Sequence, residues 1–474
     1  MKTPITILTA AIGLAAFAGR AQLFIAGVQI GTRPGAFAPE EFDSSKSGRR
    51  AVTWFRHAGD PAWGDSRTDY VDRFSVVKPV DGDAAGRPLL VVLHWRGAGW
   101  PGKGVDMQTE LADDKDRVFS APDDFYILNL DDIRDYNVLL NRTHDQYWWG
   151  ATPLYAGPTV ADVPRLVKGE TPCEKRVLAS IEWTIERYGI DRDRVYLCGN
   201  SMGGQAAEAI GLNHGEIFAA VNANVPATVW FAAARLGFVN ADGSPRVDTK
   251  GGPTAEPPFL VEWSGVDDKW SRDREVMLAG LRRRHWAHIV LWGDYGHCGL
   301  VSEARRKNDL VEKFDWLALR RNEAYPVFTE ASCDDAFPWP FAVFEPKRAS
   351  FSGWKGDIES AKMKIAEGAK SVGQVNAFFR WRVIADTDRE FAIELRLASP
   401  GELATERFAP PERATATVGV RRIQSPAIAG AKRLAWSFGD RSGTVERDES
   451  GTLAIPGLEL AREPRVLKLA TAVR

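Results

Sequence analysis

The stretch that decides the fold is residues 194–204, RVYLCGNSMGG, in which an apolar run leads into Gly199-Asn200-Ser201-Met202-Gly203. The run has the β-branched and aromatic character of a buried strand, and the small residues at 205–209, QAAEA, favour a helix. A serine between a strand and a helix, with glycine two positions before and after it, is typical of a nucleophile elbow. The turn is tight, so its flanking positions must be small. The pattern predicts that Ser201 is a nucleophile and that the backbone N–H of Met202 faces an oxyanion.

A catalytic serine needs a base, and the base needs an acid that orients it. Two later apolar runs, 259–263 and 288–292, end in glycine-containing turns that carry Asp267-Asp268 and His297. The carboxyl ends of parallel strands share one edge of a sheet, where the active site of such a sheet lies. We expect His297 to be the base and Asp268 the acid. Asp267 is the alternative acid, and one of the two aspartates caps the following turn.

A third strand end lies upstream, where the run at 89–93 leads into His94-Trp95-Arg96-Gly97. The first β-to-α loop of such a sheet supplies the second oxyanion N–H. We expect the backbone of Arg96 or Trp95 to donate it. The alternative is a glycine-rich turn without a role.

Short apolar runs alternate with helical patterns from about residue 72 to 325, which predicts an α/β domain with a parallel sheet. The helices are expected at 174–188, with Gly189 as a C-terminal cap, and at 309–320. Further strands are expected at 74–77, 125–130, 195–198 and 218–225. Prolines mark a linker at 329–348, and residues 349–474 are strand-rich after one helix at about 358–369. Their strands are expected at 375–384, 391–397, 415–421, 433–438, 452–455 and 466–469, as a small antiparallel sandwich.

Composition limits the class of protein. The chain has 474 residues, 44% of them hydrophobic and 26% charged, which excludes a mainly disordered chain. A net charge of −2 excludes a nucleic-acid binder that depends on a basic field. Lys2, an apolar stretch and Ala16-Phe17-Ala18 are typical of an export signal over residues 1–21, so we expect a secreted or periplasmic protein; a retained anchor is the alternative. Residues 22–328 then form the catalytic domain.

Together these motifs resemble the α/β-hydrolase fold, and within it the secreted feruloyl, acetylxylan and polyhydroxyalkanoate esterases. The resemblance covers residues 72–325 and implies a sheet with helices on both faces. The C-terminal β-sandwich-like domain lies outside it and resembles the accessory β-sandwiches appended to secreted bacterial hydrolases. The acid in these families sits three residues after the strand-end glycine, which is Asp268 here. It implies a serine carboxylic-ester hydrolase with a Ser201-His297-Asp268 triad, acting on small-molecule or polysaccharide-linked esters, without a metal or another cofactor. The alternatives are a serine peptidase of the prolyl-oligopeptidase kind and an inactive binding protein of the same fold.

Aromatic residues and cysteines give two further expectations. The sequence has 17 tryptophans, and four of them, Trp95, Trp148, Trp149 and Trp270, are predicted in loops at the catalytic edge. They would bind a ring-bearing substrate; packing of the loops is the alternative. Of the four cysteines, Cys198 is expected to be a buried thiol. We expect a Cys173–Cys298 disulfide, with Cys298–Cys333 as the alternative pairing.

Overall fold

The computed structural model describes residues 37–63, 71–95, 119, 121–137, 142–145, 148, 169–226, 230–240, 244–249, 252–253, 255–266, 268, 274–297, 314–338, 367–403, 408–448 and 451–471. The predicted export signal lies outside these residues, as do half of the predicted linker and most of the helix expected at 358–369.

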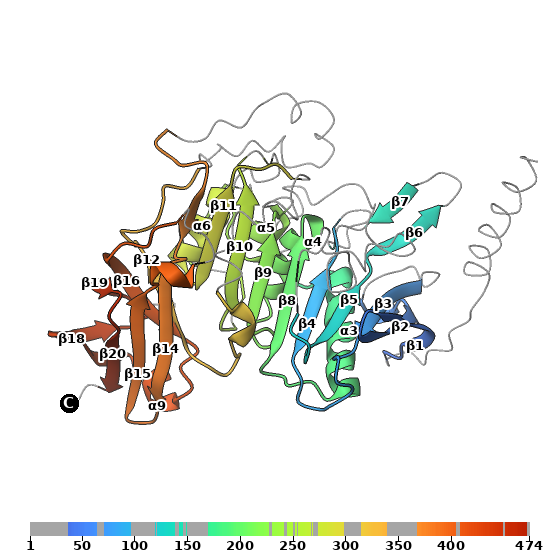
Figure 1. Ribbon diagram of the computed structural model, residues 1–474, viewed down its shortest axis with the longest axis horizontal. Coiled ribbons are helices and arrows are strands. Elements are labelled where there is room, and N and C mark those ends of the chain that lie inside the picture. The colour runs from blue at the N-terminus through green and yellow to red at the C-terminus, as the bar shows by residue number, and fades with distance from the viewer. Residues whose placement is uncertain are drawn as a thin grey trace, which may run out of the picture.

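Ten strands form one sheet, in the order β1-β2-β3-β5-β4-β8-β9-β10-β11-β13 (Figure 1). Their bounds are β1 Glu40–Ser47, β2 Arg50–Ala58, β3 Val71–Val77, β4 Leu89–Leu93, β5 Tyr126–Leu130, β8 Val195–Asn200, β9 Ala220–Asn224, β10 Phe259–Gly265, β11 His288–Gly293 and β13 Gly373–Val375. The helical elements between them are η1 Pro61–Trp63, α3 Pro172–Tyr188, α4 Met202–Ala206, the π-helical turn η3 Ala207–Gly211, α5 Trp230–Arg235, α6 Arg274–Arg283 and the 3₁₀ turn η5 Trp316–Ala318. A small hairpin, β6 Ile133–Asn137 with β7 Arg142–Asp145, stands apart from the sheet.

The order of the strands identifies the fold. Strands β5, β4, β8, β9, β10 and β11 are mutually parallel, whereas β3 runs antiparallel to both of its neighbours. Strands β4 and β5 exchange places relative to their order in the chain. This is the strand arrangement of the α/β-hydrolase fold. The fold class predicted from the sequence is confirmed.

Strand β4 shows why these runs are continuously apolar. Leu89, Val91 and Leu93 pack into the core beneath α3, α4, α5 and α6, while Leu90 and Val92 pack into the core on the opposite face. All five side chains are buried. Because side chains alternate across a strand, a strand covered on both faces needs an apolar residue at every position.

Helix α3 is closed at both ends by local chemistry. Thr171 and Glu174 form a reciprocal capping box around Pro172, and Gly189 ends the helix in the left-handed conformation with φ 63°. The predicted helix and its glycine cap are confirmed, with a start two residues earlier than expected.

Three sequence-based element predictions are wrong in the described residues. Of the helix expected at 309–320, residues 314–320 contain only the 3₁₀ turn η5. The strand expected at 375–384 is split into β13 and β14 (Phe379–Asp386) by Asn376, which adopts a left-handed φ of 62° that asparagine tolerates. Residues 452–454 are not a strand; β19 begins at Ile455 and ends at Ala461.

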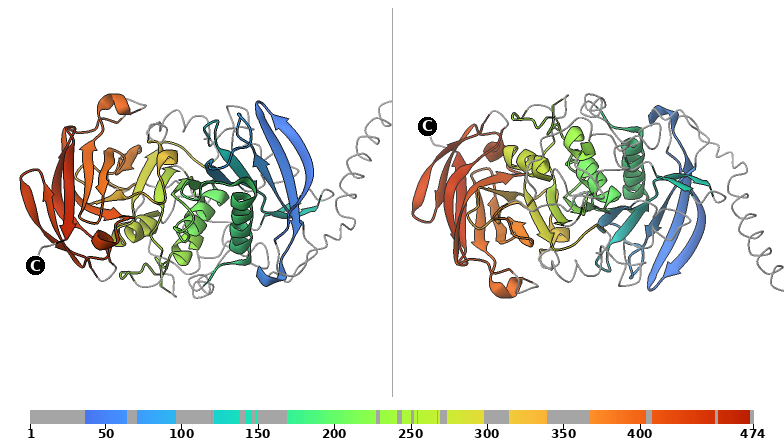
Figure 2. Two further views of the ribbon diagram at one scale, coloured as in Figure 1. Left: turned by 90° about the horizontal axis from the view of Figure 1, so that it is seen from below. Right: turned by 90° about the horizontal axis from the view of Figure 1, so that it is seen from above.

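The C-terminal residues form two further sheets, a three-stranded one and a five-stranded one. The first has the order β12-β16-β19 and the second β14-β15-β20-β17-β18; the remaining bounds are β12 Tyr325–Thr329, β15 Glu390–Leu397, η8 Pro400–Glu402, β16 Arg413–Arg421, α9 Pro426–Ala429, β17 Arg433–Phe438, β18 Arg441–Glu446 and β20 Arg465–Thr471. The rings of Phe328 and Phe379 stack between them at 3.9 Å. The pair is a β-sandwich-like layer at one end of the long axis, opposite β1–β3 (Figure 2).

Strand pairing links the C-terminal layer to the large sheet. Strand β12 pairs with β16, although it precedes the predicted linker almost entirely. Strand β13, which follows that linker, pairs with β11 at the edge of the ten-stranded sheet. The domain boundaries at 328 and 349 stay a prediction. A strand before the linker belongs to the C-terminal layer, and a strand after the linker belongs to the large sheet.

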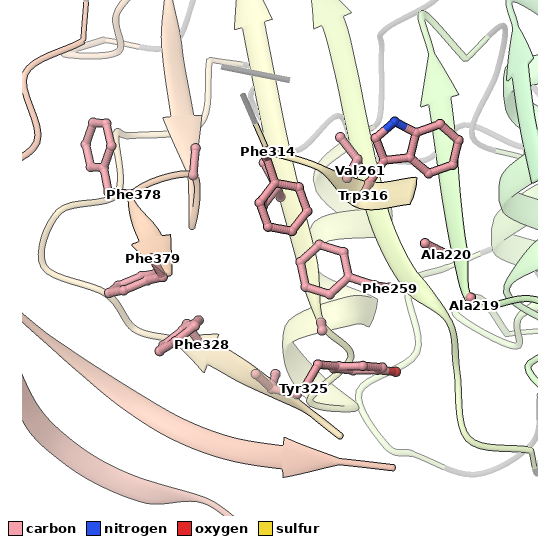
Figure 3. Packing of buried hydrophobic residues seen from close by; sticks show 14 of the residues in the cluster. Ala219, Ala220, Phe259, Val261, Phe314, Trp316, Tyr325, Phe328, Phe378 and Phe379 are labelled. Carbon is pink, nitrogen blue, oxygen red and sulfur yellow. The ribbon is translucent and has the colours of Figure 1, made fainter. Parts of the chain in front are cut away.

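Aromatic rings and a buried arginine lie at the junction between the two sheet systems. Trp381 of β14 lies 5.5 Å from Phe259 of β10 and 5.5 Å from Phe314, measured between ring centroids. Figure 3 shows Phe259 and Phe314 together with Tyr325, which packs against Phe259. Arg422, with φ 56°, donates hydrogen bonds to the main-chain carbonyls of residues 215, 218, 219 and 256. These loops precede β9 and β10, so the C-terminal layer supports the large sheet from its amino-terminal edge.

In the part of the chain that the structure describes, no helix combines the length and the apolar character needed to cross a membrane.

Because Trp381 joins the two sheet systems, Trp381→Ala should lower the free energy of unfolding of the whole protein by about 2 kcal/mol. Wild type and variant should each unfold in one calorimetric transition. Arg382→Ala is the matched control, because this neighbour is exposed and should cost less than about 0.5 kcal/mol. Two separate transitions in the wild type would contradict the coupling.

Candidate active site

The serine turn stands where strand β8 ends and α4 begins. Ser201 has φ 56° and ψ −115°, and residues of this kind cost about 1–3 kcal/mol of backbone strain unless their surroundings hold them. Its N–H donates to the carbonyl of Asn224 at 2.9 Å, and its carbonyl accepts the N–H of Gln205 at 3.1 Å. The neighbouring strand and the helix therefore hold the strained residue in place.

Glycines around the serine are required by close backbone contacts. A Cβ on Gly199 would lie 2.1 Å from the carbonyl oxygen of Gly203, and a Cβ on Gly203 would lie 1.9 Å from that of Leu93. A Cβ on Gly204 would lie 2.6 Å from the carbonyl oxygen of Asn224. No other residue fits these positions without moving the main chain, which is the steric reason for the glycines in the motif.

Three side chains from three strand ends meet at this turn. The Oγ atom of Ser201 lies 2.6 Å from Nε2 of His297, and Nδ1 of His297 lies 2.8 Å from Oδ2 of Asp268. An ionised carboxylate only accepts, so Nδ1–H donates to Asp268 and Nε2 of the neutral ring is left to accept the serine proton. Asp268 is fully buried and His297 is mostly buried. The structure thus brings together the three residues expected as nucleophile, base and acid; Asp267 lies outside the described residues.

The expected oxyanion donors are placed in part. Met202 is the first residue of α4, and its side chain is fully buried beneath the turn. Trp95 lies half-buried directly after His94 at the end of β4. Arg96 lies outside the described residues.

The aromatic prediction is wrong at Trp148. This side chain has no exposed surface and packs edge-to-face on the ring of His94, 5.1 Å away. It cannot present a face to a substrate, because none of its surface is exposed. Trp149 and Trp270 lie outside the described residues, and Trp95 remains a candidate for substrate contact.

The disulfide predictions are also wrong. Cys173 and Cys333 are both thiols in the structure, so neither forms the expected bridge; Cys298 itself lies outside the described residues. The Sγ of Cys173 donates to Oδ1 of Asp132 at 3.4 Å, inside the fold rather than at the loop of His297. Cys198 is a buried thiol, as expected, and burial raises the pKa of this thiol well above its usual range.

A buried charge cluster behind the site was missed from the sequence. Arg274 of α6 donates to both carboxylate oxygens of Glu208, in the π-helical turn after α4, and to Glu262 of β10. Ser264 donates to Glu262 at 3.1 Å. The cluster ties the helix that follows Ser201 to the strand that leads to Asp268. The signal was weak: Glu262 is a charged residue within an apolar strand, a position where burial requires a partner.

One arginine cannot neutralise two buried carboxylates. Burial, together with the charge of Glu262, raises the pKa of Glu208 to about 8. Burial and the charge of Glu262 thus favour the protonated form of Glu208, whereas the charge of Arg274 opposes it. Among the described residues, no group of three or more His, Cys, Asp or Glu side chains is arranged to hold a metal ion.

A comparison with protein families finds one family model that matches the segment around the serine turn. A family model for the prolyl oligopeptidase family matches residues 171–236, which run from α3 through Ser201 to α5. No curated protein sequence matches the chain significantly.

Solved structures with similar folds include esterases and peptidases. An S-formylglutathione hydrolase from Agrobacterium tumefaciens is 13% identical, with a TM-score of 0.35, and covers 55% of this chain and 94% of its own. A ferulic acid esterase from Anaeromyces mucronatus is 15% identical, with a TM-score of 0.34, and covers 57% of this chain and 89% of its own. An acylaminoacyl peptidase from Pyrococcus horikoshii is 12% identical, with a TM-score of 0.34, and covers 62% of this chain and 52% of its own. The assignment of the fold rests on the strand order, not on these scores.

Replacing Gly203 by alanine should disrupt the serine turn, because the added Cβ overlaps the carbonyl oxygen of Leu93. We expect a loss of about 2 kcal/mol or more in the free energy of unfolding. Gly169→Ala is the control, since nothing lies within 4 Å of its Cβ position. Urea denaturation measures both variants; equal stabilities would contradict the close contact.

Replacing Glu208 by glutamine should increase the free energy of unfolding most at alkaline pH. The folded pKa of about 8 lies above the usual value of 4.5, so the wild type loses stability as the pH rises through this interval. Glu208→Gln has no proton to lose, and its free energy of unfolding relative to wild type should rise by about 2 kcal/mol or more between pH 5 and pH 8. Urea denaturation at both pH values measures the difference. Parallel pH curves for the two proteins would show that Glu208 is ionised in the fold.

Proposed function

We propose that this chain is a serine hydrolase that cleaves carboxylic esters through an acyl-enzyme. The observation that supports the proposal is the unbroken chain of contacts from Oγ of Ser201 to His297 and on to Asp268, with the serine on a strained turn between a strand and a helix. This combination of nucleophile, base and orienting acid is the arrangement that acyl transfer needs.

The reaction proceeds in two halves. His297 takes the proton from Oγ of Ser201 as the oxygen attacks the ester carbonyl, and Asp268 stabilises the imidazolium that forms. The oxyanion accepts hydrogen bonds from the N–H of Met202 and from the backbone after β4. The tetrahedral intermediate expels the alcohol, which takes its proton from His297. Water then attacks the acyl-enzyme by the same route and releases the acid.

A peptidase activity is the second candidate. The match of residues 171–236 to the prolyl oligopeptidase family supports it, because that match includes the serine turn. The triad chemistry is the same for both activities, and the leaving group distinguishes them. An amine must be protonated by His297 before it leaves, whereas an alkoxide leaves more readily.

We favour esters that are small or attached to polysaccharide or phenolic groups, and a secreted or periplasmic location for the mature chain.

Ser201→Ala should lower kcat/KM for an aryl ester by at least about 10³-fold, because the acyl-enzyme cannot form. The variant should also lose covalent labelling by a fluorophosphonate probe. Ser442→Ala, at an exposed position of β18, is the control and should keep both properties. A panel of acetyl, longer aliphatic, feruloyl and peptide substrates then separates esterase from peptidase. Activity of Ser201→Ala within tenfold of wild type, or a wild type that does not react with the probe, would contradict the proposal.

A further inference from the structure

Trp148 makes polar contacts at both its side chain and its backbone, although it was expected to face a substrate. Its indole Nε1–H donates to the main-chain carbonyl of His94 at 3.1 Å, and its own backbone N–H donates to Oδ2 of Asp132 at 2.8 Å. Trp148 has a left-handed φ of 59° and no exposed surface. These two hydrogen bonds hold the indole in one orientation next to the end of β4.

The ring of His94 continues the same chain of hydrogen bonds. Its Nε2 accepts the backbone N–H of Asp132 at 2.9 Å, and the Asp131 carboxylate lies 3.5 Å from this nitrogen. Because Nε2 accepts, the proton sits on Nδ1, which donates to the carbonyl of Trp95 at 2.6 Å. Two successive main-chain carbonyls at the end of β4, those of His94 and Trp95, are therefore each held by a buried side chain.

Holding a carbonyl also holds the amide on the other side of the same peptide. The peptide group is planar and trans, so its N–H points opposite to its C=O. The carbonyl of His94 shares its peptide with the N–H of Trp95. The N–H of Trp95 is one of the two amides that the sequence predicts as the second oxyanion donor. This peptide lies against the serine turn, since a Cβ on Gly203 would lie 2.8 Å from the carbonyl oxygen of His94.

Asp132 is itself anchored firmly. Arg176 of α3 donates to Asp132 at 2.9 Å, to Asp72 at 3.0 Å and to the carbonyl of Asp131 at 2.6 Å, and it lies 5.7 Å from the Trp148 ring centroid. Burial alone would lower the pKa of Arg176, but the charge of Asp72 and that of Asp132 raise it above its ordinary value. The anchor is a charged group fixed between α3, β3 and the segment after β5.

We propose that Trp148 is a positioning residue for the oxyanion hole: through the His94 carbonyl and the His94 ring, it orients the peptide between His94 and Trp95 so that the N–H of Trp95 stabilises the transition state. This inference rests on the proposed esterase function. Trp148 touches no reacting atom and acts through the peptide between His94 and Trp95. Its loss should therefore affect the transition state more than the bound substrate.

Trp148→Phe tests this, because it removes the indole N–H and keeps an aromatic ring. We expect kcat for an aryl ester to fall by about 10-fold or more, with KM within about threefold of wild type. The affinity for an alkyl boronic acid, which forms a tetrahedral adduct on the serine, should fall by about the same factor as kcat. A residue with only a structural role would lower stability without this selective loss of tetrahedral-adduct binding.

Trp292→Phe is the matched control. Trp292 is also fully buried, and its Nε1–H also donates to a main-chain carbonyl, that of Lys370, at 2.9 Å. This variant loses the same kind of hydrogen bond, but in strand β11 next to the outermost strand β13. Its kcat should stay within about twofold of wild type. If the phenylalanine at 148 destabilises the fold, 3-benzothienylalanine at that position keeps the bicyclic shape with sulfur in place of N–H, and the same kinetic result is expected.

The outcomes separate this inference from the proposed function. An unchanged kcat and an unchanged boronic-acid affinity in either Trp148 variant, with Ser201→Ala inactive, would overturn the positioning role and leave the esterase standing. An equal loss of kcat in the Trp292 and Trp148 variants would likewise overturn it. A wild type that neither reacts with the fluorophosphonate nor hydrolyses esters would overturn both.

Discussion

The structure depends on one close backbone contact, that of Gly203 with the end of β4. Because this residue has no Cβ, α4 can approach the Leu93 carbonyl closely enough to bring the start of the helix against the neighbouring strand. That contact sets Ser201 on a strained turn beside the strand end where the oxyanion donors are expected. The strain is held by hydrogen bonds from the two elements that meet there.

Charged groups buried behind this contact connect elements that are far apart in the sequence. Arg176 joins α3 to β3 and to the segment after β5, and Arg274 joins α6 to β10 and to the turn after α4. Buried ion pairs of this kind contribute little net stability, but removing one partner leaves an uncompensated charge and is costly. Each arginine therefore restricts how its elements can shift relative to one another. The first cluster lies beside His94 at the end of β4, and the second lies behind the serine helix and the strand that leads to Asp268.

The C-terminal layer is joined to the large sheet by strand pairing. Strand β12 pairs into this layer and β13 pairs back onto the large sheet, so neither sheet system closes without residues from the other side of the predicted linker. Arg422 adds hydrogen bonds to carbonyls in the loops before β9 and β10. The amino-terminal edge of the sheet is thereby supported opposite the edge that carries the site. Sequence patterns identified the parallel strands and several C-terminal ones, but neither β1, β2, β12 and β18 nor this exchange, because the pairing of strands depends on distant partners.

Local sequence determined the parallel strands, helix α3 and the three residues that meet at the serine turn. Ser201, Asp268 and His297 each follow an apolar run, and the parallel sheet places the ends of such runs at one edge. Only the tertiary structure decided what Trp148 and Cys173 do. The environment of a loop tryptophan or a helix-end thiol depends on which distant groups cover it; here these are His94 and Asp132, so an expected substrate platform is a buried support and an expected disulfide is a thiol. Short-range patterns state which residues lie at a strand end, whereas burial and hydrogen bonding arise from contacts that no short stretch of sequence contains.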